Sequence, residues 1–154
     1  MANKAKGTTK RISNRRARFD YELGDSLVVG AQLTGAETKS LRMGHGHLRG
    51  AYVTTNSNNE LILINATIAG SNGIHIDESE QTRPRKLLAK RKEIDALIEA
   101  KRQGRTIVPL EILTAGRYIK VRIAIGKGRK NYDKRQTLKA RDDARRSAAA
   151  IKNR

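Results

Sequence analysis

Two strand-like segments in the last third of the chain, separated by a Gly-containing turn, restrict the fold more than any other feature. Thr106–Leu113 is a short apolar run, and from residue 119 to residue 125 every second residue is Ile or Val. The residues between them include Lys120 and Arg122. Because successive side chains of a strand point to opposite faces, the second segment is predicted to have one buried face and one cationic face. Pro109 lacks a backbone N–H and suggests that the first segment lies at a sheet edge.

Three other apolar segments predict further strands. They lie at residues 27–33, 51–55 and 60–68, each bounded by turn-forming residues. In the last of these segments, Ile62, Ile64, Ala66 and Ile68 are expected to share one face. Roughly six short strands in antiparallel order suggest a mainly β fold, either a small barrel or a half-open sheet.

Two helices are predicted between these strands. Thr34 and Glu37 have the spacing of a capping box, in which each side chain satisfies the free backbone N–H of the other residue. A helix is therefore expected from about Gly35 to Met43. A longer helix is expected from Pro84 to Gln103, and Gly104 would end it. Its apolar face would contain Leu87, Leu88, Ile94, Leu97 and Ile98.

Positive charge is concentrated at the two ends of the chain. The 33 Lys and Arg residues exceed the 15 Asp and Glu residues by 18. Residues 1–18 contain seven basic groups and no acidic group, and residues 127–154 contain eleven basic groups and three acidic ones. A polyanion is the natural partner of two separated cationic arms, and the phosphates of a nucleic acid provide it. Solvated Lys and Arg side chains without a partner are the less favoured alternative.

The distribution of apolar residues divides the chain into three parts. Residues 1–13 are small, polar and cationic and predict a disordered arm. Residues 14–128 would form the folded barrel. Residues 129–154 contain no Gly or Pro and only three sizeable apolar groups, so they predict a basic tail that is disordered alone and helical when bound. Asp133, three residues before Gln136, is a candidate cap for the start of that helix.

Residues that would carry chemistry are scarce. The chain has no Cys, and the pair His45 and His47, with His75 distant in the sequence, has no carboxylate or Cys at metal-ligand spacing, so a metal site is disfavoured. Residues 126–130 are Gly-Lys-Gly-Arg-Lys, which lacks the Walker spacing and its Ser or Thr. No stretch is long and apolar enough to span a membrane, and residues 1–13 lack the apolar segment of a signal peptide. We therefore expect a cytoplasmic protein that is not an enzyme, with no metal, cofactor or membrane partner.

Several long motifs, in order, resemble one family of bacterial proteins, the SsrA-binding proteins of the SmpB family. The resemblance runs from about Asn14 to Arg135. Its motifs are Asn-Arg-Arg-Ala-Arg-Phe-Asp-Tyr at 14–21, Thr-Gly-Ala-Glu-Thr-Lys-Ser-Leu-Arg at 34–42, Arg-Pro-Arg-Lys-Leu-Leu at 83–88, Lys-Glu-Ile at 92–94, and Gly-Lys-Gly-Arg-Lys-Asn-Tyr-Asp-Lys-Arg at 126–135.

This resemblance implies an oligonucleotide-binding-type (OB-like) barrel of six antiparallel strands with two to three helices and a basic C-terminal tail. It also implies a function in trans-translation, the rescue of stalled ribosomes with peptide tagging. In the family, the barrel holds the tRNA-like domain of tmRNA, and elongation factor Tu is a partner through tmRNA. The tail enters the empty mRNA channel of the small subunit and contacts its rRNA. The protein itself performs no chemical step in that scheme.

The resemblance also implies two groups of site residues. The Lys and Arg residues would neutralise phosphates. Glu37 is equally plausible as the capping-box partner alone. Leu88 could lie in the core or contact an unstacked base. The tmRNA-binding group is Asn14, Arg15, Arg16, Glu37, Lys39, Arg42, Leu88, Lys90, Lys120 and Lys127. The group for the tail and the ribosomal decoding centre is Gly128, Tyr132, Asp133, Lys134, Arg135 and Lys139.

Some residues depart from the family pattern. Val28 stands where an acidic residue is usual, Phe19 replaces a frequent His, and Lys90 replaces a common Asn or His. Residues 43–52 are also divergent. These departures suggest co-variation with an unusual tmRNA.

Other functions remain as alternatives to ribosome rescue. A ribosomal or general RNA-binding protein would have the same charge distribution. An RNA-modifying enzyme is disfavoured because no catalytic set is evident. A membrane-surface protein is disfavoured because the tail lacks an apolar face.

Overall fold

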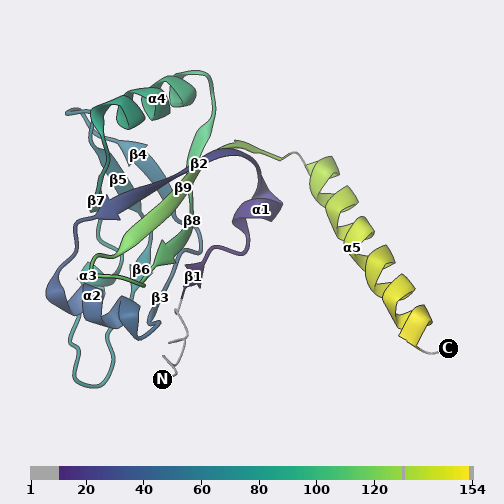
Figure 1. The fold of residues 1–154 in the computed structure, drawn as a ribbon, viewed down its shortest axis with the longest axis horizontal. Coiled ribbons are helices and arrows are strands. Elements are labelled where there is room, and N and C mark those ends of the chain that lie inside the picture. Colours follow the sequence, from purple (N-terminus) through teal and green to yellow (C-terminus); the bar gives the residue numbers. More distant parts are fainter. Residues whose placement is uncertain (1–10, 130, 153–154) are drawn as a thin grey trace, which may run out of the picture.

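The structure is a computed structural model that describes residues 11–129 and 131–152. Its larger sheet contains β1 (Ile12–Ser13), β2 (Tyr21–Ala31), β4 (Tyr52–Thr55), β5 (Leu61–Ile64), β7 (Arg85–Leu88), β8 (Thr106–Leu113) and β9 (Lys120–Gly128). Its smaller sheet pairs β3 (Gly46–His47) with β6 (Thr67–Ile68). The helices are α1 (Ala17–Asp20), α2 (Gly35–Arg42), α3 (Glu78–Gln81), α4 (Arg91–Arg102) and α5 (Asn131–Lys152) (Figure 1).

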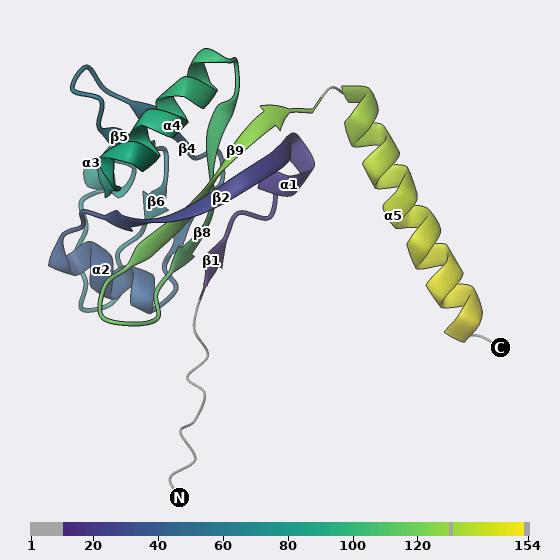
Figure 2. The same cartoon turned by 45° about the horizontal axis from the view of Figure 1, so that its top comes forward.

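Six strands of the larger sheet close into a ring, as expected for a small barrel. Their order is β8-β4-β5-β7-β2-β9, and β9 pairs again with β8. All of these pairings are antiparallel, and β1 is attached to β8 outside the ring. Helices α4 and α2 lie at opposite ends of the barrel, whereas α5 projects away from it (Figures 1 and 2). The mainly β class and the six-stranded barrel are therefore confirmed.

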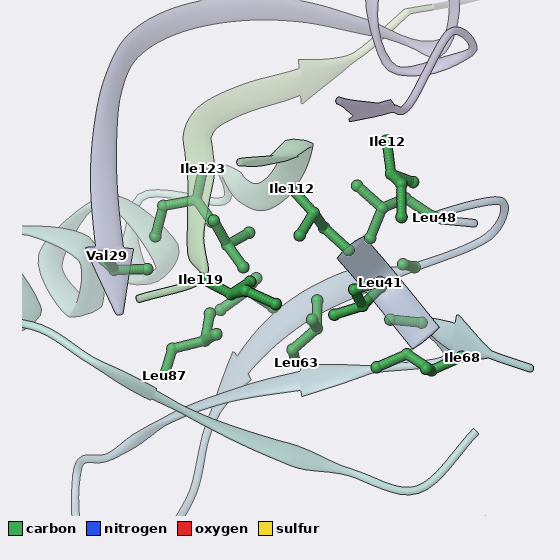
Figure 3. Packing of buried hydrophobic residues seen from close by; sticks show 14 of the residues in the cluster. Ile12, Val29, Leu41, Leu48, Leu63, Ile68, Leu87, Ile112, Ile119 and Ile123 are labelled. Atoms are coloured by element: carbon green, nitrogen blue, oxygen red, sulfur yellow. The ribbon is translucent and has the colours of Figure 1, made fainter. Parts of the chain in front are cut away.

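The interior of the ring is aliphatic. Side chains from the strands, from α2 and from the β3–β6 sheet meet there (Figure 3). Such burial stabilises the fold by about 25 cal/mol for each Å² of apolar surface removed from water. The least exposed large apolar residues are Leu41, Leu48, Leu61, Ile68, Leu87, Ile107, Ile112, Ile123, Val53, Val108 and Val121.

The predicted hairpin is confirmed, although the position of its first strand is not. Strand β8 has the predicted bounds, and Ile119, Val121 and Ile123 are buried. The expectation of an edge strand from Pro109 is wrong, because β8 pairs with β9 on one side and with β1 and β4 on the other. The β8–β9 register shifts between Pro109 and Glu111, and an irregularity of this kind accommodates the missing N–H.

The segment predicted as one strand at residues 60–68 is divided by Asn65. This residue has a φ of 60°, in the left-handed region, and it separates β5 from β6. The break at Asn65 shifts the alternation of inward-facing residues by one position. The predicted common face is therefore wrong for Ile62 and Ile64 in β5, whereas Ala66 and Ile68 are both buried. The buried residues are Leu61, Leu63, Ala66 and Ile68.

The helix predicted from Pro84 to Gln103 begins too early. Residues Arg85–Leu88 form β7, which pairs with β5 and with β2. Helix α4 starts only at Arg91, where the Glu93 carboxylate accepts the backbone N–H of Lys90. Two adjacent leucines fit a strand here, since Leu87 is buried and Leu88 is exposed. The helix ends at Arg102 with Gln103 as its C-cap, one residue before the predicted end.

Regular structure begins earlier than predicted at the N-terminal end. Ile12 and Ser13 form β1 and pair with Ile112 and Glu111 of β8. The side chain of Ile12 is buried, so the prediction of a disordered arm is wrong for Ile12 and Ser13. The prediction for residues 1–10 falls outside the described part of the chain. The predicted helix after Thr34 is confirmed as α2, and the capping box is present.

The tail after residue 130 forms α5. Asp133 is the third residue of this helix, so the expected cap at Asp133 is wrong. Within the described ranges, no helix combines the length and the apolar composition needed to cross a membrane.

Candidate nucleic-acid interface

The outer side of β7, β2 and β9 contains a row of three residues. Gly30 of β2 is the Cα partner of Leu88 on one side and of Lys120 on the other. Directly opposite residues of an antiparallel sheet present their side chains on the same face. Leu88 is 52% exposed and Lys120 is also exposed, so this face presents an apolar side chain and a cation together.

A second row extends this face by one step of the pleat. Val28 is the Cα partner of Arg122, two residues along each strand from the first row. Val28 is 39% exposed. Gly30 has no side chain between the two apolar residues, and a Cβ added there would lie 3.4 Å from the Cβ of Leu88. We call Val28, Gly30, Leu88, Lys120 and Arg122 the sheet face. An apolar patch beside cations fits an unstacked base with its flanking phosphates.

Glu37 is not on a surface that RNA can reach. Its side chain is buried between the guanidinium groups of Arg83 and Arg85, and it also accepts the backbone N–H of Thr34. Burial by itself raises the pKa of Glu37. The hydrogen bonds from Arg83, Thr34 and Arg85 outweigh it and lower this pKa to about 2. The structure therefore gives Glu37 a structural role in place of the implied RNA contact.

Arg85 completes this buried cluster and was not singled out by the sequence. Its side chain is fully buried, and it donates hydrogen bonds to the carbonyl oxygens of Ala66, Glu80 and Gln81 at 2.7, 3.1 and 2.9 Å. These bonds join β7 to α3 and to the segment before β6, and the ion pair with Glu37 adds α2. The only signal in the sequence was the pair of arginines around Pro84.

Arg42 is also engaged within the protein. Its guanidinium donates hydrogen bonds to the carbonyl oxygens of Thr114, Gly116 and Arg117 at 3.0, 3.0 and 2.9 Å. It therefore holds the turn between β8 and β9. Tyr118, beside that turn, is 68% exposed with the Arg117 guanidinium 5.6 Å from its ring centroid. Tyr118 is not among the predicted site residues, although the alternation of β9 places it on the same polar face as Lys120 and Arg122.

Three residues selected near the N-terminal end have different surroundings. Asn14 donates from Nδ2 to the carbonyl oxygen of Pro109 at 2.9 Å, which fixes the corner before α1 to β8. Arg16 lies 3.7 Å from the Asp20 carboxylate and 5.8 Å from the centroid of the Phe19 ring. Arg15 is exposed and makes no ion pair with another described residue.

The remaining selected cations of the barrel are exposed. Lys39 lies on α2, Lys90 precedes α4, and Lys127 is near the end of β9 opposite Glu22. Lys39, Lys120 and Lys127 make no ion pair with any other residue that the structure describes. Their ammonium groups are therefore available to phosphates.

The tail begins where β9 ends. Gly128 is the last residue of β9 and pairs with Tyr21. In α5, Arg135 and Lys139 are exposed, whereas Lys134 lies 3.2 Å from the Asp20 carboxylate. Tyr132 and Asp133 belong to α5, but their side chains lie outside the described part.

The histidines do not form a cluster. His75 lies 2.7 Å from the carboxylate of Asp77. Among the described residues, no group of three or more His, Cys, Asp or Glu side chains is placed to hold a metal ion.

Comparison with known proteins identifies the family. The sequence model of the family described as SmpB protein matches residues 11–153. The chain is 42% identical over 154 residues to the SsrA-binding protein of Oenococcus oeni, covering 99% of both chains. It is 41% identical over 156 residues to that of Nostoc sp., again covering 99% of both.

A solved structure also matches the fold. A chain of "tmRNA-SmpB: a journey to the center of the bacterial ribosome" superposes with a TM-score of 0.66 and 32% identity. The match covers 84% of this chain and 94% of that chain. The sequence matches extend over nearly the whole chain and the structural match over most of it, and the chain therefore belongs to the SmpB family.

Proposed function

We propose that this protein binds tmRNA and delivers it to stalled ribosomes for trans-translation. The observation that carries this proposal is the sheet face, where exposed Leu88 and Val28 lie beside Lys120 and Arg122 on a barrel of the SmpB family. The relatives are SsrA-binding proteins, and the similar solved structure describes tmRNA and SmpB on the bacterial ribosome.

In this proposal the barrel binds the tRNA-like domain of tmRNA. Leu88 packs against an unstacked base, because single-stranded RNA loops expose base faces that are stacked inside a base-paired RNA helix. Lys120 and Lys127 of β9 neutralise phosphates, and exposed Lys39, Lys90, Arg15 and Arg16 extend the cationic surface. Glu37, Arg42 and Asn14 act indirectly, since each one fixes a segment beside this surface.

The tail has a different partner in this proposal, the rRNA of the small ribosomal subunit. Helix α5 has 22 residues and projects from the barrel, so its cations reach an RNA that the barrel does not touch (Figure 2). Lys134, Arg135 and Lys139 would contact rRNA phosphates, and Tyr132 and Asp133 would lie at the decoding centre, with Gly128 as the exit from the barrel. The tail thus occupies the empty mRNA channel, and elongation factor Tu participates through tmRNA. The protein contributes binding and positioning, and the chemistry belongs to the ribosome.

Gel-shift binding tests the barrel assignment. Leu88→Ala is expected to weaken binding of the tRNA-like domain about tenfold, because an apolar contact of one side chain is worth about 1.5 kcal/mol. Leu138→Ala, at an apolar residue of α5 with a similar exposed fraction, is the matched control and should leave this binding unchanged. Equal affinity for the tRNA-like domain and for an unrelated duplex at physiological salt would favour a general RNA-binding protein instead.

The tail assignment needs a second measurement. A protein that ends after Gly128 keeps all the strands of the barrel and is expected to retain binding to the tRNA-like domain. It should fail to support peptide tagging on stalled ribosomes in a reconstituted translation system. Loss of RNA binding by this shortened protein would contradict the division of roles between barrel and tail.

A further inference from the structure

A groove of about 750 Å³ lies on the barrel surface beside β1 and the corner that leads into α1. Strands β2, β8 and β9 also contribute to its walls. Its charged residues are five arginines, Arg11, Arg15, Arg18, Arg122 and Arg129, and two glutamates, Glu22 and Glu111. We call these residues the arginine groove. Of the five arginines, the family resemblance implies only Arg15 as a site residue, and the groove brings it together with four further guanidinium groups.

Glu111 organises two of the arginines. Its carboxylate lies 3.5 Å from Nη1 of Arg11 and 3.4 Å from Nε of Arg122, and its side chain is only 13% exposed. The Nε atom of Arg122 is buried and makes no hydrogen bond within the described protein. One carboxylate between two guanidinium groups leaves a net positive charge, with both arginines held at the groove.

The other arginines leave more charge unneutralised. Arg15 and Arg18 are exposed and form no ion pair with the rest of the described chain. Arg129 donates from Nη1 to the hydroxyl of Thr137 at 3.0 Å, a neutral acceptor. Guanidinium groups match phosphate oxygens in a bidentate geometry. The excess of five arginines over two glutamates therefore favours a ligand with several phosphates.

The uncharged lining selects among polyanions. Tyr21 and Leu23 contribute aromatic and apolar surface to the same groove. Nucleic-acid bases stack on aromatic side chains, and a single strand exposes its bases for such contacts. A polyanion of carboxylates alone, such as polyglutamate, has no bases to stack on this surface. The lining thus fits a single RNA strand better than it fits an acidic protein segment.

The position of the groove connects the two RNA-binding parts of the protein. Arg122 belongs both to the sheet face and to the arginine groove. At the other end, Arg129 lines the groove and contacts Thr137 of α5. We propose that the arginine groove binds the sugar–phosphate backbone of a single RNA strand between the sheet face and the root of the tail. This inference goes beyond the proposed function, since it needs no particular folded RNA.

The test uses the full chain and a fluorescent oligouridylate about ten nucleotides long. Arg15→Gln combined with Arg18→Gln is expected to weaken its binding about tenfold at 0.1 M salt. The slope of log K against log salt should fall in magnitude by about 1.4, because each phosphate contact to a single strand contributes about 0.7. Lys92→Gln combined with Arg102→Gln removes the same charge from exposed sites on α4 outside the groove and is the matched control.

The outcomes separate this inference from the proposed function. Weaker oligouridylate binding by the groove variant, with the control variant unchanged, supports the groove. Equal losses in both variants, or no loss in the groove variant, would overturn it. Displacement of the oligouridylate by polyglutamate at equal charge concentration would overturn the preference for RNA. The sheet face is tested by binding of the tRNA-like domain to Leu88→Ala and the groove by binding of oligouridylate to the groove variant, so a failure at the sheet face and a failure at the groove are distinguishable. Circular dichroism of each variant checks that the fold is retained.

Discussion

The ammonium group of Lys134, in the first turn of α5, lies 3.2 Å from the carboxylate of Asp20, the last residue of α1. The same ammonium group lies 5.8 Å from the centroid of the Phe19 ring. The guanidinium carbon of Arg16 lies at the same distance from that centroid. The backbone N–H of Arg129 also donates to the carbonyl oxygen of Asp20. These contacts make α1 the support that sets the direction in which the tail leaves the barrel.

Loss of the Asp20 charge is expected to broaden the range of tail directions. Since the chain has no Cys, spin labels can be placed on cysteines introduced at exposed Asn72 and Ser147. Pulsed electron resonance should show a wider distance distribution for Asp20→Asn than for the protein without this substitution. Asp95→Asn, which removes a comparable ion pair with Arg91 on α4, should leave the width unchanged. Equal widths in all three proteins would refute the role of α1.

Glu37→Gln is expected to destabilise the barrel by about 3–5 kcal/mol, because it leaves the buried guanidinium of Arg85 without its counter-charge. The free energy of unfolding is measured by urea denaturation. Glu60→Gln is the control, since it removes an ion pair with Lys86 that is much more exposed. That substitution should cost no more than about 1 kcal/mol. A similar decrease in the free energy of unfolding for both variants would contradict a larger contribution from the buried ion pair of Glu37.

The same carboxylate predicts a dependence of stability on pH. The pKa of Glu37 is about 2 in the folded protein against an ordinary value of 4.5. A depressed folded pKa stabilises the native state above pH 4.5, and this contribution is lost as pH falls from about 4.5 to about 2. The difference corresponds to about 3 kcal/mol. Unfolding free energies measured across this range should fall less steeply with acidification in Glu37→Gln. Parallel curves for the two proteins would contradict the assignment.

Arg42→Ala should loosen the turn between β8 and β9, because it removes the guanidinium that donates to three carbonyl oxygens there. Each hydrogen bond to a charged group contributes about 1.5–3 kcal/mol, and water replaces part of it at this partly exposed turn. We expect a net loss of about 1–2 kcal/mol in urea denaturation. Amide hydrogen exchange should become faster at residues 115–118 than in the protein with Lys39→Ala, which alters the same helix without these bonds. Unchanged exchange at the turn would contradict this role.

Local patterns are sufficient to determine several elements of the fold. The β9 alternation needs only neighbouring residues to define its buried face, and the capping box of Thr34 and Glu37 lies within one helical turn. The charge asymmetry also follows from the sequence alone, as does the motif resemblance that the family match bears out.

Other features depend on partners far along the chain. Arg85–Leu88 has an apolar pair that suits a helix or a strand equally, and pairing with β5 and β2 decides for the strand. Pro109 indicates an edge, but β1 and β4 cover that side of β8. The sequence of a segment shows the spacing of its apolar residues. Which strands the segment pairs with depends on the packing of the whole barrel.

The site divides in the same way. Sequence and family resemblance selected Leu88 and Lys120, but only β2, which places Gly30 between them, shows that they share a face. Glu37 and Arg85 are 48 residues apart, and only the folded chain brings them together in a buried pair. Composition thus determined that the protein is strongly cationic at both ends. Tertiary structure decided which charges neutralise one another inside and which remain outside for RNA, because burial and ion pairing depend on distances that only the closed barrel defines.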